Sequence, residues 1–196
     1  MVATLGEGRT PLVASVRIGA ELGMRRLAFK LESANPSGSY KDRFIAAEIT
    51  RLLRSGARAC VATSSGNTGA SLAAYCARYE IHCTILVNEF TPEGKLPQMK
   101  AHGAQVVRIR GFGGDARVTA QTFSQLRRFS TEGALPLVVS AFRYCLESMQ
   151  GVRSLAHELR EQTGELAHVF VPVGSGGLFT AVCQGLEGSK ARAHAV

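Results

Sequence analysis

The sequence from Arg26 to Gly69, RLAFKLESANPSGSYKDRFIAAEITRLLRSGARACVATSSGNTG, decides the fold. Residues 26–32 alternate between apolar and polar side chains, which predicts a strand. Residues 40–54 then carry apolar side chains at helical spacing up to Gly56, and a second strand is expected at 58–63. A strand, a helix and a further strand in this order form the unit from which parallel sheets are built.

The same alternation continues along the rest of the chain. The pattern predicts strands at 83–87, 105–109, 137–140 and 168–173, a last strand beginning at 191, and helices at 68–79, 94–102, 114–129, 146–162 and 178–186. The predicted class is therefore α/β, with mainly parallel sheets and helices on both faces. In such sheets ligands bind at the carboxyl ends of the strands, where loops enter helices.

The end of the sequence does not fit a complete sheet of this kind. The last strand begins at Ala191, and only six residues, 191–196, remain for it. A parallel strand without a following helix leaves one face of its sheet poorly covered. We therefore expect the chain to be truncated at its C-terminus.

Composition narrows the class of protein. Of 196 residues, 45% are hydrophobic and 19% are charged, which is typical of a globular protein and excludes disorder. No apolar stretch approaches the ~20 residues of a membrane span. The net charge of +8 is not clustered, which favours a mildly basic protein over one that binds nucleic acid, although it could help to collect an anionic substrate.

The number and spacing of the cysteines indicate whether a metal site or disulfides are expected, and in which cellular compartment the protein works. The five cysteines, Cys60, Cys76, Cys83, Cys145 and Cys183, form no C-x-x-C pair, and their number is odd. We therefore predict no metal site and no disulfide framework, with most of these side chains packed in the core. A reduced, cytoplasmic compartment is the expectation that follows.

The first candidate loop, Asn35-Pro36-Ser37-Gly38-Ser39-Tyr40-Lys41-Asp42-Arg43, opens helix 40–54. Lys41 is therefore expected at a helix N-terminus, where the helix dipole disfavours a second positive charge and burial would lower its pKa further. A neutral amine can attack a carbonyl and form a Schiff base. The alternative is a solvated lysine in a serine-rich cap, with Asp42 and Arg43 paired locally.

The second loop, Thr63-Ser64-Ser65-Gly66-Asn67-Thr68-Gly69, also joins a strand to a helix. Consecutive backbone N–H groups and hydroxyls at a helix start suit a carboxylate or a phosphate. The candidate ligands for such an anion are Ser64, Ser65, Gly66, Asn67 and Thr68. The alternative is an ordinary capping turn, since Ser, Asn and Thr all cap helices.

The third loop, Val173-Gly174-Ser175-Gly176-Gly177-Leu178, follows strand 168–173. Its glycines permit close backbone approach, and its turned N–H groups would form a nest for an anion. Phe179 stands where the dinucleotide fingerprint needs its third glycine, and the terminal Gly-Lys-Ser/Thr of a Walker A loop is missing. The alternative is a tight strand-to-helix turn. A similar run, 111–114, precedes Asp115, whose negative charge would repel a bound anion. We therefore predict a turn and a helix cap at that position.

Together, a Schiff-base lysine, a phosphate cradle and a carboxylate cradle are the parts that hold pyridoxal phosphate and an amino acid. With these motifs in this order, and with Gly6-Glu7-Gly8-Arg9-Thr10-Pro11-Leu12 before them, the chain resembles the fold-type II pyridoxal-phosphate enzymes, the tryptophan synthase β family. The resemblance covers nearly all of the sequence. It implies that Lys41 binds pyridoxal 5'-phosphate covalently and that Asn67 reaches the ring oxygen of the cofactor. It also implies that Ser64, Ser65, Gly66, Asn67 and Thr68 bind the carboxylate of the substrate. The phosphate of the cofactor would be bound by Gly174, Ser175, Gly176, Gly177 and Leu178.

Within that family, several runs are most similar to the threonine synthases. They are NPSGSYKDR, residues 71–78 after the asparagine loop, and VPVGSGG. The run Gln150-Gly151-Val152-Arg153-Ser154 departs from their E-G-x-K-T pattern, and Arg for Lys replaces a point charge by a planar fork. The implied activity is a lyase that converts O-phosphohomoserine to threonine and phosphate. The alternatives are β-replacement of the cysteine synthase kind, serine or threonine dehydration, and a catalytically incomplete fragment that keeps the fold.

The resemblance also implies an architecture. Two three-layer α/β domains with mainly parallel sheets would hold the cofactor in the cleft between them. The smaller domain is expected at residues 45–145, inserted into a larger, incomplete domain made of 1–44 and 146–196. The full-length form is expected to be a homo-oligomer, a dimer, that acts on a small amino acid and binds neither nucleic acid nor membrane.

Overall fold

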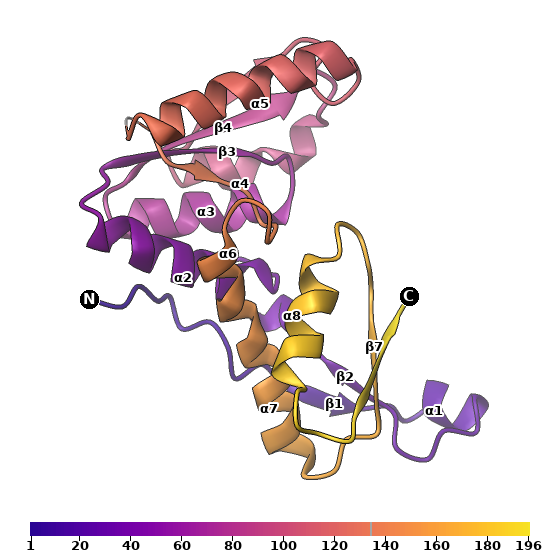
Figure 1. Ribbon diagram of the computed structural model, residues 1–196. Coiled ribbons are helices and arrows are strands. Elements are labelled where there is room, and N and C mark those ends of the chain that lie inside the picture. The colour runs from indigo at the N-terminus through magenta and orange to yellow at the C-terminus, as the bar shows by residue number, and fades with distance from the viewer. Residues whose placement is uncertain (134) are drawn as a thin grey trace.

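The computed structural model describes residues 1–133 and 135–196. It consists of two parts that lie one below the other in Figure 1, with α2 (Lys41–Arg54) and α6 (Leu146–Met149) between them. One part holds a four-stranded sheet, and the other holds two two-stranded sheets beside α7 (Ser154–Thr163) and α8 (Gly177–Gly185). The predicted α/β class is confirmed.

The four-stranded sheet is parallel throughout, as predicted. Its order is β5-β4-β3-β6, formed by β5 (Gln105–Ile109), β4 (His82–Asn88), β3 (Ala59–Thr63) and β6 (Leu137–Val138). The helices α3 (Asn67–Arg78) and α2 lie on one side of this sheet, and α5 (Ala116–Thr131) lies on the other (Figure 1). These are the three layers expected of the smaller domain.

The alternation of side chains along these strands explains why both faces are covered. On β3, Cys60 and Ala62 pack in the core beneath α2 and α3, whereas Val61 packs with Leu86 and Leu126 beneath α5. Successive side chains of a strand point to opposite faces, so a strand that is apolar at every position needs a helix on each side. Asp115 caps α5 as predicted, because its carboxylate accepts from the N–H groups of Arg117 and Val118.

The other part departs from the predicted sheet pattern. The expected strand 26–32 is β2 (Ala28–Lys30), which pairs antiparallel with β1 (Leu12–Ala14). Neither β1 nor the short α1 (Ile18–Glu21) was predicted, since three or four residues carry too little periodicity to be recognised. The second small sheet is parallel, as predicted, and consists of β7 (His168–Val171) and β8 (Arg192–Ala195).

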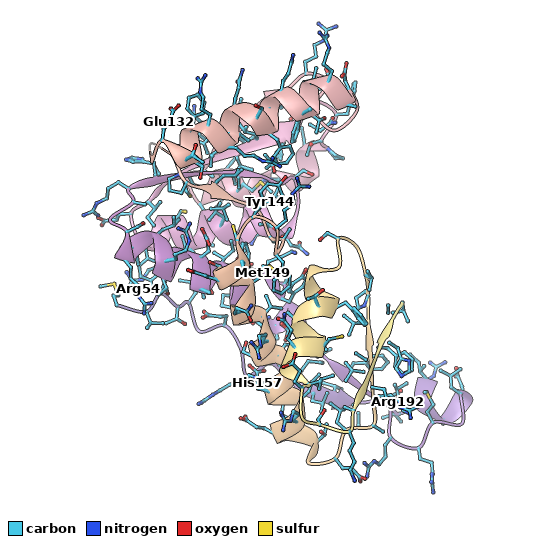
Figure 2. The ribbon with its side chains drawn as sticks, viewed as in Figure 1. Arg54, Glu132, Tyr144, Met149, His157 and Arg192 are labelled. Atoms are coloured by element: carbon cyan, nitrogen blue, oxygen red, sulfur yellow. The ribbon has the colours of Figure 1, made fainter. Side chains whose placement is uncertain are left out.

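The helix expected at 146–162 is interrupted. It consists of α6, the 3₁₀ turn η3 (Gln150–Arg153) and α7. A Cβ atom at Gly151 would lie 2.5 Å from the carbonyl oxygen of Arg43, so α2 and η3 are in backbone contact at this point. Met149, labelled between the two parts in Figure 2, is fully buried there. The remaining short elements are η1 (Glu32–Ala34), η2 (Glu93–Lys95) and α4 (Pro97–Ala101).

None of the helices within residues 1–133 and 135–196 has both the length and the hydrophobicity that a membrane crossing needs.

Candidate active site

Lys41 lies at the first position of α2, as the sequence predicted. Its Nζ atom donates to the hydroxyl of Tyr40 at 2.6 Å and to the hydroxyl of Ser140 at 2.9 Å. Burial of the side chain lowers the pKa of Lys41 from 10.5 to about 8, because a cation loses its hydration there. Within the described part of the chain, no carboxylate forms an ion pair with this amine.

The loop before Lys41 is pinned by Asp42, which is fully buried. Its carboxylate accepts from the backbone N–H of Ser37 at 2.7 Å and from the hydroxyls of Ser37 and Ser71. The alternative interpretation of this loop had Asp42 and Arg43 paired with each other. That pairing is absent, because the Asp42 carboxylate is bound by the two serines. Asp42 fixes the loop to itself and to α3, and this leaves Lys41 free to point into the site.

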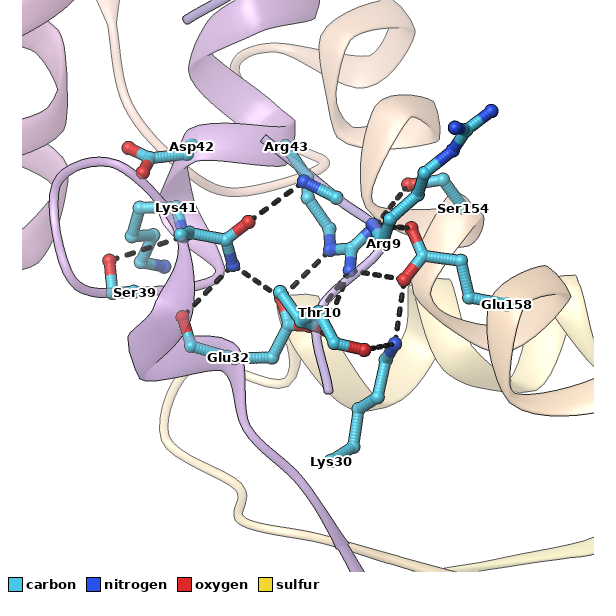
Figure 3. A network of polar contacts seen from close by, with 12 residues as sticks. Arg9, Thr10, Lys30, Glu32, Ser39, Lys41, Asp42, Arg43, Ser154 and Glu158 are labelled. Carbon is cyan, nitrogen blue, oxygen red and sulfur yellow. Dashed lines mark hydrogen bonds and ion pairs between the residues drawn. The ribbon is translucent and has the colours of Figure 1, made fainter. Parts of the chain in front are cut away.

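Arg43 connects the same turn to the part of the molecule that contains β2 and α7. Figure 3 shows its buried guanidinium between two carboxylates, those of Glu32 at 2.8 Å and Glu158 at 2.5 Å. Glu158 also binds Lys30 at 2.7 Å. Buried charges of opposite sign that are bonded on several sides hold their elements in one arrangement. This network joins β2, α2 and α7, and so sets the position of Lys41 relative to β7 and α8.

The network should make the protein sensitive to acid. Burial alone would raise the pKa of Glu158, but hydrogen bonds from Arg43 and Lys30 lower it from 4.5 to about 2. The stabilisation is fully present above pH 4.5 and is lost as the pH falls through 2, because the unfolded chain takes up the proton first. The free energy of unfolding, measured by urea titration, should fall with acidification in this window. Glu158→Gln should flatten that dependence, whereas Glu165→Gln, at an exposed ion pair, should not. Equal slopes for both variants would contradict the assignment.

The third loop faces Lys41 across a cavity. The cavity has a volume of about 640 Å³, and its lining includes Tyr40, Lys41 and the whole run from Gly174 to Leu178. Gly176 has φ +82°, a left-handed conformation that glycine adopts without strain, and it precedes the first residue of α8. Within residues 1–133 and 135–196, the N–H groups of Ser175, Gly176 and Gly177 donate to no protein acceptor. The loop is therefore a set of free donors at a helix N-terminus, which attracts an anion.

Only part of the second loop, residues 63–69, is connected to Lys41. The Ser64 hydroxyl is used locally, where it accepts from the N–H groups of Gly66 and Gly69. Asn67 and Gly66 are exposed, and Ser65 is half-buried. Thr68 is buried, and its hydroxyl lies 3.0 Å from that of Ser140. Of the five predicted substrate ligands, only Thr68 is thus connected to Lys41 by hydrogen bonds.

Ser140 joins the first two loops by hydrogen bonds and lies against the third, and it was not identified from the sequence. Its hydroxyl lies between Lys41 and Thr68, and its carbonyl oxygen would lie 3.5 Å from a Cβ at Gly177. One signal was available, since Ser140 ends the predicted strand 137–140 and ligands gather at carboxyl ends of parallel strands. Tyr40, whose hydroxyl accepts a hydrogen bond from Lys41, was likewise not identified from the sequence as a site residue.

Four of the cysteines, Cys60, Cys76, Cys83 and Cys145, are buried, which confirms the prediction that most of them belong to the core. Three of these four lie together, an arrangement that their sequence spacing does not reveal.

Comparison with known proteins defines the class of protein to which this fold and site belong. The family described as "Pyridoxal-phosphate dependent enzyme" matches residues 3–196, and the chain belongs to this family. The cofactor of the family is pyridoxal 5'-phosphate, as the resemblance implied.

Individual proteins of known name are also similar to this chain. The threonine synthase of Bacillus sp. (strain ULM1) is 36% identical over 184 residues, which are 93% of this chain and 49% of that protein. The threonine synthase of Methanocaldococcus jannaschii is 34% identical over 95% of this chain and 44% of its own length. The chain thus spans about half the length of the curated relatives it matches. Among solved structures, maize serine racemase has a TM-score of 0.79 at 26% identity, covering 96% of this chain and 55% of that one.

The residues present fit the cofactor. A phosphate needs several N–H donors and room for close approach, and the loop 174–178 offers free N–H groups with no heavy atom within 4 Å of a Cβ placed at Gly174 or Gly176. An aldehyde needs an amine that is partly neutral near pH 7, and Lys41 provides one in the same cavity.

Proposed function

We propose that the protein is a pyridoxal-phosphate-dependent lyase that converts O-phosphohomoserine and water to threonine and phosphate. The observation that carries the proposal is the placement of Lys41, whose partly neutral amine shares a cavity with the anion-binding loop 174–178. The choice of substrate is supported by the threonine synthases among the relatives, at 34–36% identity. The proposal concerns the full-length protein.

In this proposal Lys41 has two roles. Its Nζ atom would hold the cofactor, and the same amine, once free, would take the proton from Cα of the substrate. A pKa of about 8 instead of 10.5 makes the neutral amine about two orders of magnitude more abundant at pH 7. When bound, pyridoxal phosphate supplies an electron sink for the negative charge that develops on the substrate.

The other loops orient the reactants. Gly174, Ser175, Gly176, Gly177 and Leu178 bind the phosphate of the cofactor through their backbone, and Asn67 donates to its ring oxygen. Ser64, Ser65, Gly66, Asn67 and Thr68 bind the carboxylate of the substrate. Ser140 accepts a hydrogen bond from the Lys41 amine and lies 3.0 Å from the hydroxyl of Thr68. In the net reaction the bond between Cγ and the phosphate oxygen breaks and Cγ gains a proton, while Cβ gives up a proton and takes a hydroxyl group from water.

The domain division and the assembly are proposals of the same kind. A larger domain of residues 1–44 and 146–196 and a smaller domain of 45–145 would enclose the cofactor. The division at residue 44 falls within α2, which packs against both α3 and α6. We propose a cytoplasmic homodimer as the full-length form.

The activity is tested by assaying one preparation with four substrates: O-phosphohomoserine, serine, threonine and O-acetylserine. Phosphate release from O-phosphohomoserine, with threonine formed in equal amount, is the expected result. Pyruvate or 2-oxobutyrate from serine or threonine would assign a dehydratase instead, and incorporation of sulfide into O-acetylserine would assign β-replacement. Cofactor binding without any turnover in the full-length protein would support the catalytically incomplete alternative.

The glycine loop provides a test of cofactor binding. Gly176→Asp should weaken binding of pyridoxal phosphate by about 1–3 kcal/mol, because it puts a carboxylate where an anion must lose its hydration. It also forces a residue with a Cβ into the left-handed conformation at φ +82°. Gly103→Asp is the matched control, since Gly103 has a similar φ of +77°, a Cβ there meets nothing within 4 Å, and it lies outside the cavity that contains Lys41. Binding is measured by fluorescence titration of the cofactor-free protein. Equal affinity for the folded Gly176→Asp protein and the wild type would reduce the loop to a structural turn.

A further inference from the structure

Three cysteines from different elements meet in the core of the parallel sheet. Cys60 and Cys83 are register partners on β3 and β4, so their side chains lie on the same face of the sheet, and Cys76 comes from α3, which covers that face. The Sγ atoms of Cys60 and Cys76 are 3.6 Å apart, and all three Sγ atoms lie within 4.8 Å of one another. We call Cys60, Cys76 and Cys83 the thiol cluster.

The thiol cluster lies apart from the site that contains Lys41. Cys60 is the second residue of β3, and the loop that begins at Ser64 leaves the other end of that strand. At about 3.3 Å per residue, four residues of strand separate the two regions by about 13 Å. The sulfur atoms therefore play no part in the proposed reaction, and the cluster is closed to solvent, with exposures of 0%, 1% and 8%.

The spacing of the sulfur atoms suits an atom that accepts three sulfur ligands. An atom at the apex of a pyramid, about 2.3 Å from each of three sulfurs and with angles of about 100° between its bonds, separates those sulfurs by about 3.5 Å. The Sγ atoms of Cys60 and Cys76 are 3.6 Å apart, and the third lies within 4.8 Å of both. In the part of the chain that the structure describes, no fourth His, Cys, Asp or Glu joins the three at this spacing. Structural zinc is almost always bound by four ligands, so three sulfurs alone fit it poorly.

Charge decides between the remaining candidates. All three side chains are closed to solvent, so any net charge left on the bound cluster would lie in the core without hydration. A divalent ion on three thiolates would leave one negative charge in the core, and a monovalent ion would leave two, at a large cost in desolvation.

We propose that Cys60, Cys76 and Cys83 form a binding site for trivalent arsenic, taken up as neutral arsenous acid. Three As–O bonds break and three As–S bonds form, and each departing hydroxide takes one thiol proton and leaves as water. Arsenic stays trivalent, so no oxidant or reductant is needed. Both the incoming acid and the bound product are uncharged, and an apolar core tolerates an uncharged product.

The test is arsenic binding by the full-length holoenzyme. The protein is incubated with arsenite until its arsenic content is constant, and arsenic per chain is then measured by mass spectrometry and the number of As–S bonds by X-ray absorption. We expect one arsenic with three sulfur neighbours. Cys76→Ala and Cys83→Val should each abolish this binding, and Val suits the strand position and keeps the core filled. Cys183→Ala, outside the cluster, should bind as the wild type does.

Each other outcome overturns the proposal. Absence of bound arsenic in the wild type would leave the cysteines as small core residues. Binding that survives in folded Cys76→Ala and Cys83→Val proteins, or that is lost in Cys183→Ala, would place the arsenic elsewhere. Stoichiometric uptake of zinc in place of arsenic would show a fourth ligand and exclude the three-sulfur assignment. None of these measurements depends on turnover, so failure of the proposed lyase activity would not affect them.

Discussion

Replacing Lys41 by alanine should abolish covalent attachment of pyridoxal phosphate and lower turnover by at least about 10²–10⁴-fold, the usual contribution of one acid–base group. The reason is that Lys41 supplies both the amine that holds the cofactor and the base that takes the α-proton. Its Nζ atom lies in the cavity with two hydroxyl partners and a lowered pKa. Borohydride reduction of the holoenzyme, followed by peptide mapping, measures the attachment, and the phosphate assay measures turnover.

Lys30 provides an internal comparison, because it lines the same cavity. Its ammonium is held by Glu158 at 2.7 Å and by the carbonyl oxygen of Thr10 at 2.7 Å, so it should not react. The borohydride label should therefore lie on Lys41 alone. A label on Lys30, or full turnover by a folded Lys41→Ala protein, would show that the site is misassigned. Thermal unfolding of Lys41→Ala should stay close to that of the wild type, which separates a chemical defect from a folding defect.

Arg43→Ala should be the most destabilising single substitution among those considered, at about 3–5 kcal/mol. It removes a buried cation that lies between Glu32 and Glu158, and it leaves their carboxylates with fewer partners in a largely closed site. For a chain of this size the loss corresponds to a fall in Tm of roughly 6–20 °C. Calorimetry or thermal unfolding followed by circular dichroism measures it.

Two further variants make the Arg43 prediction specific. Arg43→Lys should recover part of the stability, because it keeps the charge but cannot bridge two carboxylates with a planar fork. Arg17→Ala removes an exposed arginine whose partner, Glu21, is 3.8 Å away, and it should cost less than about 1 kcal/mol. If Arg43→Ala and Arg17→Ala unfolded at the same temperature, the buried network would not be what holds β2, α2 and α7 together.

Local sequence was sufficient for the class of fold and for the position of the key lysine. The alternation of strands and helices follows from side-chain periodicity. A period of two residues for strands or 3.6 for helices can be recognised in a short segment of sequence. That Lys41 begins a helix follows equally from local order, since a glycine- and serine-rich loop precedes an apolar helix of 14 residues. The roles of Lys41, Asn67 and Gly176 stay predictions, because they concern a ligand.

Tertiary structure alone decided which distant residues meet. Ser140 is 99 residues from Lys41 and 72 from Thr68, yet its hydroxyl touches both. Arg43 reaches Glu158, 115 residues away, and this contact places the helix start against the glycine loop. The antiparallel pairing of β1 and the break of the helix at Gly151 have the same origin. Periodicity records only which face of an element is apolar, whereas the partner on that face is set by packing between elements.

The thiol cluster shows the difference most clearly. The sequence correctly indicated that most of the cysteines are core residues, because small apolar side chains at strand and helix positions are usually buried. It could not show that Cys60, Cys76 and Cys83 converge, because that depends on the register of β3 with β4 and on where α3 crosses them. Register and crossing are fixed by the whole sheet and its helices, so they exist only once the chain has folded.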